Sequence, residues 1–474
     1  MSSDQAVLDF SNIGRLYSLP KDEAWTAAEL STAISIRQEE FQEQGVTHTS
    51  RVMIAHGGTP AFFADLLAVW SLGACAVCLN AKLTQNELDT LIGFVKPALV
   101  VKEPISRPTQ PGKKGILTIA QPADREALIL FTSGTTGDPK GVVHTFGSLS
   151  TRIALNCEHI DQQNLARTLC VLPTHFGHGL IGNCLTPMAA GSDLLLMPSP
   201  NIQQMMALGN LLDDQAITFM SSVPSFWKIA LKGSPPAKHT LKQVGIGSAP
   251  LAGELVDQVA QWTGCPDVRN MYGITETANW IAGASTLDGP LSDGLVGKPW
   301  GGEAAVLRAD GMQAPTGDGE ILVRSRALMS GYLDRTDLTT AVLNDGWFHT
   351  GDKGTIDAGG RITLTGRLKS EINRAGMKIS PEEIDLLLER REDVLEACAF
   401  GIEDSIAGEI IGIALALKGG SIFSERDFRT WCTERIRAEC IPERWFVLPE
   451  IPKTDRGKLN RDMVRAKCLQ REVS

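Results

Sequence analysis

The segment 130–141 has the residues best suited to binding an anionic ligand. It reads LFTSGTTGDPKG and combines three glycines, four hydroxyl side chains and one lysine. Glycines let the backbone approach a ligand closely, and oriented amides with a nearby cation hold phosphate groups. Strand-like runs at 127–131 and 142–145 predict that this loop caps a β-hairpin. It is not a P-loop, because GxxxxGK[ST] does not align here, and an ordinary surface turn is the alternative interpretation.

A set of further motifs follows along the chain. They read NMYGITET at 270–277, GEILVRS at 319–325, GWFHTGD at 346–352, GRLKS at 366–370 and PKTDRGK at 452–458. Together with the loop, and in this order, they resemble the ANL superfamily of adenylate-forming enzymes, which includes acyl- and aryl-CoA ligases, stand-alone adenylation domains and luciferases. The resemblance implies that ATP activates a carboxylic acid as an acyl-adenylate, which then passes its acyl group to the thiol of coenzyme A.

The first step of such a reaction brings two anions together, so the site must neutralise charge around the phosphates. The resemblance assigns the phosphate groups to the loop residues Thr132, Ser133, Gly134, Thr135, Thr136, Gly137 and Lys140. It assigns a phosphate oxygen to Thr275 and a Mg²⁺ ion to Glu276, since Mg²⁺ prefers a carboxylate together with phosphate oxygens. An ordinary helix cap for Thr275 and a solvated charge for Glu276 are the alternatives.

The same resemblance places the adenosine of ATP between several motifs. Tyr272 would pack its ring against adenine, Asp352 would accept hydrogen bonds from both ribose hydroxyls, and Arg367 would donate another. The remaining residues of this nucleotide-binding set are Asn270, Met271, Gly273, Gly247, Ser248, Ala249 and Pro250. A solvated aspartate in a turn is the alternative interpretation of Asp352.

Lys458 is the predicted catalytic residue of the C-terminal segment. In the family, the matching lysine bridges the attacking carboxylate and the α-phosphate, which implies that a small domain rotates about a hinge at Lys369. Surface solvation is the alternative for Lys458, because the final segment is broadly basic and such runs are usually solvated. Ala375 and Gly376 match the passage for the pantetheine arm of coenzyme A.

The acid pocket implied by the resemblance consists of His175, Phe176, His178, Val223 and Gly245. Either histidine could contact a polar substituent of the acid or be satisfied by a neighbouring carbonyl. Segment 173–180 has no aspartate to hold an ammonium group, which disfavours an amino-acid substrate. Trp280 could shorten the pocket, although ordinary core packing is the favoured interpretation.

The acceptor stays open between free coenzyme A and the phosphopantetheine of a carrier protein. The sequence ECIP at 439–442 replaces the family's Tyr-Lys-x-Pro, which removes a basic residue near the expected phosphates of coenzyme A. A stand-alone enzyme that loads a carrier protein is therefore the second hypothesis. A nucleotide-binding protein without catalysis is disfavoured, because Glu276, Asp352 and Lys458 are all present, and pyrophosphate release would discriminate it from a ligase.

Composition restricts the partners and the compartment. A formal net charge of −10 argues against nucleic acid or an anionic membrane surface as a partner. No N-terminal signal and no apolar run of membrane-spanning length is visible. The ten cysteines lack framework spacing, and the CxxC at 75–78 lies in an apolar stretch, so we expect buried thiols in a reduced, cytoplasmic protein. We expect a monomer or a homodimer that acts on a small-molecule carboxylic acid.

Two domains must position these motifs, because 474 residues exceed the size at which one core keeps growing. Helices and strands alternate in the N-terminal part, beginning with a predicted helix at 26–45 and a predicted strand at 52–55. This rhythm indicates an α/β adenylation domain with largely parallel strands over residues 1–366. Short alternating strands at 294–365 predict a β-rich subdomain within it.

A small, mobile α+β lid domain is predicted over residues 367–474. Ser380 should cap a helix that begins at Pro381, with glutamates in its first turn. A strand is predicted at 394–400 and a second helix at 425–439.

Overall fold

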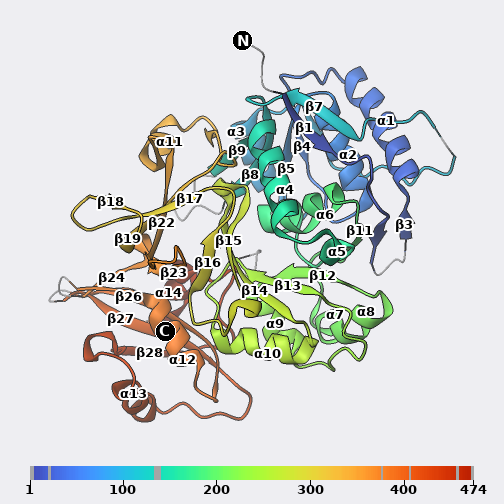
Figure 1. The fold of residues 1–474 in the computed structure, drawn as a ribbon. Helices are drawn as coiled ribbons and strands as arrows, with labels where there is room; N and C mark the ends of the chain where they lie inside the picture. The colour runs from blue at the N-terminus through green and yellow to red at the C-terminus, as the bar shows by residue number, and fades with distance from the viewer. Residues whose placement is uncertain are drawn as a thin grey trace.

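The computed structural model describes residues 5–19, 23–110, 112–132, 140–374, 377–404, 407–454 and 458–470. Figure 1 shows a large N-terminal body, coloured from blue to orange, and a smaller C-terminal domain in orange and red that lies against it. The body is α/β and the smaller domain is α+β, which confirms the predicted fold class. No helix within these ranges is both long and apolar enough to cross a membrane.

The first sheet contains the two strands that flank residues 133–139. Its strands and the helices that cover it are β4 (Arg51–Ile54), β5 (Cys75–Cys78), β6 (Leu99–Val101), β8 (Glu126–Thr132), β9 (Lys140–Thr145), β20 (Gly331–Tyr332), α1 (Ala27–Glu43), α2 (Pro60–Ser71) and α3 (Gln85–Val95). Strands β6, β4, β5 and β8 run parallel, and β9 returns antiparallel to β8, so the predicted hairpin is confirmed. Alternate strand residues face opposite sides, since Val52 belongs to the core of α1 and α2, whereas Met53 belongs to that of α3.

Local sequence fixes where these elements begin. Helix α1 starts at a capping box in which the side chains of Thr26 and Glu29 each accept the other's backbone N–H. Helix α2 has Pro60 at its first position, where the missing N–H costs nothing. The thiols of Cys75 and Cys78 on β5 are buried, as predicted.

The second sheet contains the strands whose ends form the candidate site. Its members are β2 (Leu16–Ser18), β3 (Glu23–Trp25), β10 (Arg167–Cys170), β11 (Asp193–Leu196), β12 (Phe219–Ser222), β13 (Gln243–Gly247), β14 (Asp267–Ile274), β15 (Asn279–Ser285), β16 (Leu295–Pro299), β17 (Glu303–Leu307), β18 (Gln313–Ala314), β19 (Gly317–Arg324), β21 (Leu343–Asn344), β22 (Trp347–Ile356) and β23 (Ile362–Arg367). Strands β2, β11, β10, β12, β13 and β14 run parallel, and the strands beyond β14, including those between 294 and 365, continue the sheet antiparallel. The carboxyl ends of β12, β13 and β14 therefore meet at one edge, where open α/β sheets bind ligands.

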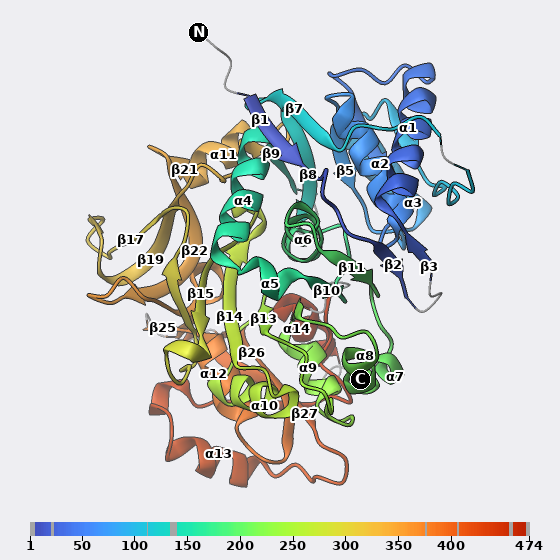
Figure 2. The same cartoon turned by 45° about the vertical axis from the view of Figure 1, so that its right-hand side comes forward.

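Helices cover this sheet and fill the space between the two sheets. They are α4 (Phe146–His159), α5 (Gln162–Leu165), α6 (Thr186–Ala189), α7 (Ile202–Met206), α8 (Leu208–Asp214), α9 (Pro224–Ala230), α10 (Gly253–Thr263) and α11 (Thr336–Val342), with the π-helical segment η1 (His178–Leu185) and the 3₁₀ turns η2 (Thr275–Thr277) and η3 (Thr286–Asp288). Strands β1 (Gln5–Asp9) and β7 (Thr118–Pro122) pair separately. Figures 1 and 2 place α4 between the two sheets. All residues of η1 are buried, and π-helical turns are frequent at functional sites.

The C-terminal domain packs its helices on a sheet of its own. Its elements are β24 (Ile372–Arg374), β25 (Met377–Ile379), β26 (Val394–Asp404), β27 (Gly408–Leu417), β28 (Arg444–Val447), α12 (Pro381–Glu389), α13 (Glu425–Thr433), η5 (Ala438–Cys440) and α14 (Arg461–Gln470), and the 3₁₀ turn η4 (Leu368–Ser370) joins it to β23. Ile384, Ile413 and Phe428 are buried in its core. Apolar residues of α12 and α13 thus cover the sheet and hold the domain together.

Two details of this domain differ from the sequence prediction. The prediction that the second helix continues to residue 439 is wrong, because α13 ends at Thr433 and the chain then turns so that Cys440 is buried. Ser380 does precede α12, but its hydroxyl donates to the Thr365 carbonyl at 2.8 Å instead of capping the helix. Ser380 therefore contacts the strand that leads to the hinge.

Candidate active site

One cavity lies where the small domain meets the carboxyl ends of β13 and β14. The space in it that water-sized spheres can occupy is about 30 Å³, well below the range for ligand sites, so the two domains leave only a narrow gap here. Its wall consists of Phe176, Gly177, His178, Ser248, Met271, Gly273, Ile274, Thr275, Asn279, Trp280 and Lys458. Lys458 is an exposed residue of the small domain, and the other residues of this wall belong to the large domain. Both domains therefore contribute to the cavity.

The turn η2, which contains Thr275 and Glu276, is fixed from behind by the large domain. His144 Nε2 on β9 donates to the Thr275 carbonyl at 2.9 Å, and Arg152 Nε on α4 donates to the Thr277 carbonyl at 3.2 Å. Both side chains are fully buried. Burial, together with the nearby charge of Arg152, lowers the pKa of His144 to about 4, so its ring is neutral and carries the proton on Nε2.

The side chain of Glu276 is oriented by a further contact. The Tyr332 hydroxyl on β20 donates to Glu276 Oε1 at 2.7 Å, and the Met329 N–H donates to the Glu276 carbonyl at 2.8 Å. Burial and the charge of Glu276 raise the pKa of Tyr332, so the phenol stays protonated and remains a donor. The carboxylate is thus held beside Thr275, as an oxygen ligand of the kind that Mg²⁺ takes.

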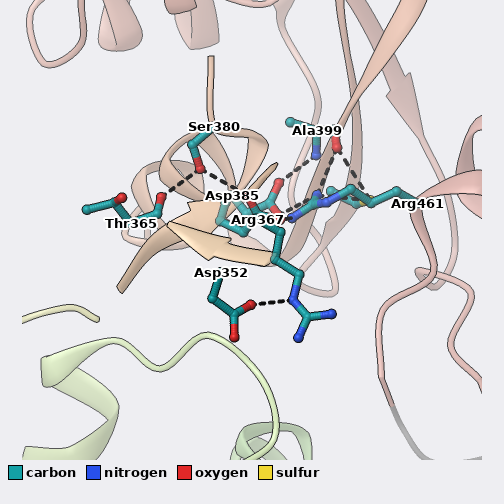
Figure 3. A network of polar contacts seen from close by, with 9 residues as sticks. Asp352, Thr365, Arg367, Ser380, Asp385, Ala399 and Arg461 are labelled. Carbon is teal, nitrogen blue, oxygen red and sulfur yellow. Dashed lines mark hydrogen bonds and ion pairs between the residues drawn. The ribbon is translucent and has the colours of Figure 1, made fainter. Parts of the chain in front are cut away.

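Asp352 accepts hydrogen bonds from two of the residues predicted to bind adenosine. The Tyr272 hydroxyl donates to Oδ2 and Arg367 Nε donates to Oδ1, each at 2.6 Å, and Figure 3 shows the Arg367 contact. The charge of Asp352 raises the pKa of Arg367, while burial and then Asp352 raise that of Tyr272. Asp352 and Tyr272 are both buried. Each carboxylate oxygen still has a second lone pair, as contact with ribose hydroxyls requires.

The segment that contains Lys458 is anchored in the small domain through Arg461. Arg461 is the first residue of α14, and it pairs with Asp385 at 2.7 Å and Glu382 at 2.9 Å. It also donates to the Ala399 carbonyl at 2.8 Å, and Figure 3 shows its contacts with Asp385 and Ala399. Burial lowers the pKa of Arg461 and the two carboxylates raise it, with a net rise. The basic C-terminal run is therefore not solvated throughout, because this arginine is an internal anchor.

Ion pairs connect the two domains on both sides of the expected hinge. Lys369 lies in η4, directly after β23. The pairs that cross between the domains are Lys353–Glu371 at 3.1 Å, Lys228–Glu389 at 2.8 Å and Asp293–Arg390. Each pair includes a partly exposed side chain, and such pairs typically contribute about 0–1 kcal/mol. These contacts hold the small domain in the orientation described, each with a small contribution.

His178 lies between two serine hydroxyls at the inner end of the cavity. Its Nδ1 is 2.9 Å from Ser248 Oγ, and its Nε2 is 2.7 Å from Ser221 Oγ, so hydroxyls rather than a carbonyl satisfy the ring. Burial and the charge of Lys458 lower the pKa of His178 to about 3. The ring is therefore neutral, and Lys458 of the small domain is close enough for its charge to lower the pKa of the ring.

The other residues predicted for the acid pocket take different positions. Phe176 lines the cavity, and His175 packs against it with ring centroids 5.5 Å apart without belonging to the wall. Gly245 lies behind the wall, where a Cβ would come within 2.6 Å of Ser221 Oγ. Val223 is buried next to α9 and also lies outside the wall.

The remaining nucleotide residues surround the ends of β13 and β14. Ser248, Met271 and Gly273 line the cavity, and the Asn270 side chain donates to a carbonyl of β16 at 2.8 Å. Gly247 lies against β14, where a Cβ would come within 2.4 Å of the Met271 carbonyl. Ala249 and Pro250 follow it toward the surface, and Pro250 is exposed.

Part of the predicted site cannot be placed. Thr132 and Lys140 are paired at the ends of β8 and β9. The predicted phosphate residues Ser133, Gly134, Thr135, Thr136 and Gly137 lie outside the described residues, as do Ala375 and Gly376.

Several residues that hold the site are absent from the sequence prediction: His144, Arg152, Ser221, Tyr332 and Arg461. The sequence does contain a signal for His144, because it is a polar residue within an apolar strand. A polar group buried in this way requires a hydrogen-bond partner. Arg152 has the same kind of signal, because it occupies the apolar face of a helix. Nothing local to Tyr332 or Ser221 indicates a partner more than forty residues away.

Two family models match the chain. The model described as AMP-binding enzyme matches residues 11–333, and the model of the AMP-binding enzyme C-terminal domain matches residues 383–458. The chain belongs to the AMP-binding enzyme family. The resemblance to adenylate-forming enzymes in the sequence is thereby confirmed.

Relatives in the AMP-binding family include CoA ligases. A probable CoA ligase of Humulus lupulus is 30% identical over 458 residues, which cover 89% of this chain and 87% of that protein. The oxalate–CoA ligase of Arabidopsis thaliana is 33% identical over 355 residues, which cover 73% of this chain and 68% of that protein. The structure of o-succinylbenzoate coenzyme A synthetase from Bacillus subtilis, in complex with ATP and a magnesium ion, matches with a TM-score of 0.84 at 23% identity, covering 98% of this chain and 100% of that one. The fold is thus that of the AMP-binding enzymes.

Proposed function

We propose that the protein is an AMP-forming acid–CoA ligase whose first half-reaction takes place in the cavity between its domains. The enzyme activates a carboxylic acid as an acyl-adenylate and transfers the acyl group to coenzyme A. One observation carries the proposal: Lys458 of the small domain shares a cavity wall with Thr275 and His178 of the large domain. CoA ligases among the relatives support coenzyme A as the acceptor.

The first step joins the acid to AMP. A carboxylate oxygen attacks the α-phosphorus of ATP, the bond to the bridging oxygen breaks, and pyrophosphate leaves with that oxygen and its charge. The Lys458 ammonium contacts both the carboxylate and the α-phosphate, and Thr275 contacts a phosphate oxygen, so both reduce the repulsion between two anions. Such groups are effective when they are positioned before the reaction. For Thr275 this position is fixed by the hydrogen bonds from His144 and Arg152 to the carbonyls of η2.

The nucleotide is held by residues beside the same cavity. Asp352 accepts the ribose hydroxyls, and Tyr272 and Arg367 fix the orientation of its carboxylate. The loop between β8 and β9 holds the β- and γ-phosphates. Glu276 holds Mg²⁺, which supplies positive charge to the phosphates when it is bound.

The second step transfers the acyl group to the thiol. The sulfur of coenzyme A loses its proton and attacks the acyl carbon, and the bond from that carbon to the AMP oxygen breaks. The small domain first rotates about Lys369, which withdraws Lys458 and brings 375–376 to the pantetheine arm. Partly exposed pairs such as Lys228–Glu389 break in this rotation, and their small contribution does not prevent it.

The test combines AMP formation in the presence of coenzyme A with pyrophosphate exchange, over a panel of aliphatic, aryl and amino acids. We expect AMP formation that rises with coenzyme A for at least one acid. Exchange that proceeds while coenzyme A has no effect would contradict this acceptor and favour a carrier protein. ATP binding without either activity would contradict the ligase function.

The hinge has a test of its own. Proline at position 369 restricts the backbone rotation that the second step requires, so Lys369→Pro should retain pyrophosphate exchange and lose thioester formation. Lys369→Ala is the matched control and should retain both. Full rates of both half-reactions in the proline variant would contradict the hinge.

A further inference from the structure

The inner end of the cavity has a hydrogen-bonded row of three side chains, Ser221, His178 and Ser248. His178 contacts Ser221 Oγ at 2.7 Å and Ser248 Oγ at 2.9 Å. Ser221 is fully buried on β12, whereas Ser248 lines the cavity. The orientation of the Ser248 hydroxyl is therefore coupled through the imidazole to a serine that a bound acid does not touch.

This row supplies a hydrogen bond but no fixed charge. Burial and the charge of Lys458 lower the pKa of His178 to about 3, so the ring is neutral. A neutral imidazole has one donor and one acceptor nitrogen. In one tautomer of His178 the Ser248 hydroxyl accepts a hydrogen bond from the ring, and in the other it donates one. In the first case it can donate to a ligand in the cavity, and in the second it can accept from one.

Trp280 forms part of the cavity wall next to His178. Its side chain is buried and packs edge-on against His178 and Phe219, with ring centroids 5.4 and 6.5 Å away. Gly182 of η1 leaves room for the indole, because a Cβ there would come within 2.8 Å of the ring. The tryptophan is thus both a core residue and part of the cavity wall, where a longer acyl chain would have to pass.

Asn279, beside this tryptophan, is a further residue of the cavity wall. Its φ of 122° lies in the region that favours glycine, and such strain concentrates at functional sites. Its Nδ2 is buried and has no hydrogen-bond partner in the part of the chain that the structure describes. This nitrogen lies against Gly182 of η1, where a Cβ would come within 2.3 Å of it, so it faces the buried segment that packs behind Trp280.

The charges of the wall restrict the acid further. Lys458 is the cationic side chain among the wall residues that the structure describes, and the first half-reaction engages it with the reacting carboxylate. A second carboxylate on the acid would be buried against the neutral His178 and Ser248. Burying an unpaired charge is far more costly than burying a hydrogen-bonded hydroxyl.

We infer that the cavity selects a short monocarboxylic acid with one uncharged hydrogen-bonding oxygen, as in a short hydroxy acid. Ser248, oriented by His178, contacts that oxygen, and Trp280 limits the chain length. This inference rests on the proposed function and names its substrate class.

Matched acids test the inference on the unmodified enzyme. AMP formation in the presence of coenzyme A is measured with a short hydroxy acid, the unsubstituted acid of the same length, a short dicarboxylic acid and a long-chain acid. We expect kcat/KM to be at least about tenfold higher for the hydroxy acid than for its unsubstituted analogue. A preference for the dicarboxylic or the long-chain acid would overturn the inference.

Ser221→Ala tests whether the buried serine acts through His178. The substitution leaves the cavity wall intact, and we expect the ratio of kcat/KM for the hydroxy acid to that for the unsubstituted acid to shrink to within about threefold. A merely structural role would lower both values equally. An unchanged preference would overturn the role of the row.

Trp280→Leu tests the limit on chain length while keeping an apolar side chain in the core. The longer acids should gain about tenfold in kcat/KM relative to the short ones. An unchanged length profile would overturn this role of Trp280.

Lys458→Ala separates the substrate class from the function itself. If the wild type forms AMP with a different acid and this variant does not, the substrate class is overturned and the ligase function stands. If the wild type forms no AMP with any acid of the panel, the proposed function fails as well.

Discussion

On the large-domain side of the cavity, buried or partly buried hydrogen bonds hold the reacting groups: His144 and Arg152 donate to the turn that contains Thr275, and Tyr332 orients Glu276. On the small-domain side, Lys458 is exposed, and the two domains meet through partly exposed ion pairs. Leaving a buried polar group without its partner costs about 1–3 kcal/mol, whereas an exposed ion pair contributes about 0–1 kcal/mol. The first side is therefore held more firmly than the second, and we call them the rigid side and the separable side.

This difference matches the needs of a two-step reaction. The nucleotide stays bound through both steps, so the groups that hold it gain from a fixed arrangement. In the proposed mechanism, Lys458 acts in the first step and leaves before the thiol arrives. Arg461 suits both requirements of that mechanism, because it fixes the start of α14 within the small domain through carboxylates of the same domain.

The largest effect is expected from Lys458→Ala, which removes the one contribution of the small domain to the cavity wall as described. Pyrophosphate exchange should fall about 10³-fold, because a preorganised cation at the reacting anions is lost. ATP binding should persist, and thioester formation from a supplied acyl-adenylate should stay within about tenfold of the wild type. The two half-reactions are measured separately.

Arg465→Ala is the matched control for Lys458→Ala. Arg465 is an exposed basic residue of α14 in the same domain. It should retain both half-reactions. Equal loss of both half-reactions in Lys458→Ala would break the comparison, because the lysine would then belong to the permanent part of the site.

The second effect, on the rigid side, is expected from His144→Leu. The Thr275 carbonyl loses its buried donor, so the turn is no longer held in one position. We expect the rate of adenylation to fall by about tenfold to a hundredfold, with the KM for ATP changed by less than about threefold. His48→Leu, at an exposed position, is the control. A wild-type rate in His144→Leu would show that the clamp is dispensable.

Much of this arrangement can be predicted from the sequence, because the chemistry is concentrated in short contiguous motifs. The order of these motifs indicates the family, and the turn chemistry of Thr26 and Pro60 marks where helices begin. The alternation of apolar and turn residues predicts the hairpin of β8 and β9. These features depend on neighbours in the chain, which a single sequence displays directly.

The supports of the motifs are harder to predict, because they come from distant parts of the chain. His144 and Thr275 are 131 residues apart, and no local pattern relates them. Arg461 belongs to a basic run that, from composition alone, is predicted to be solvated. It is partly buried instead, because carboxylates of α12 pair with its charge. Trp280 shows another limit, because a buried core residue can also line a cavity, and periodicity does not distinguish the two.

A third prediction concerns acid, which should destabilise the rigid side. The folded pKa of His178 is about 3, below the unfolded value of about 6.5, so the unfolded state binds more protons below that pH and stability falls as the pH decreases. At about pH 5 the loss due to His178 is about 2 kcal/mol. The thermal midpoint of His178→Gln should therefore fall less than that of the wild type between about pH 7 and about pH 5. An identical fall in both proteins would contradict a neutral, buried His178, and His48→Gln serves as the exposed control.

The smallest effect is expected at the ion pair between Lys228 and Glu389, which lies on the separable side. Lys228→Met should slow adenylation about twofold to fivefold and leave thioester formation unchanged or faster, because the pair stabilises the orientation of the first step alone. High salt should reduce the difference by screening the charges. The double exchange Lys228→Glu with Glu389→Lys should restore the rate, whereas Lys113→Met, which breaks an exposed pair within the large domain, should have no effect. A loss as large as that of His144→Leu would mean that the two sides are equally rigid, and that the small domain does not need to move.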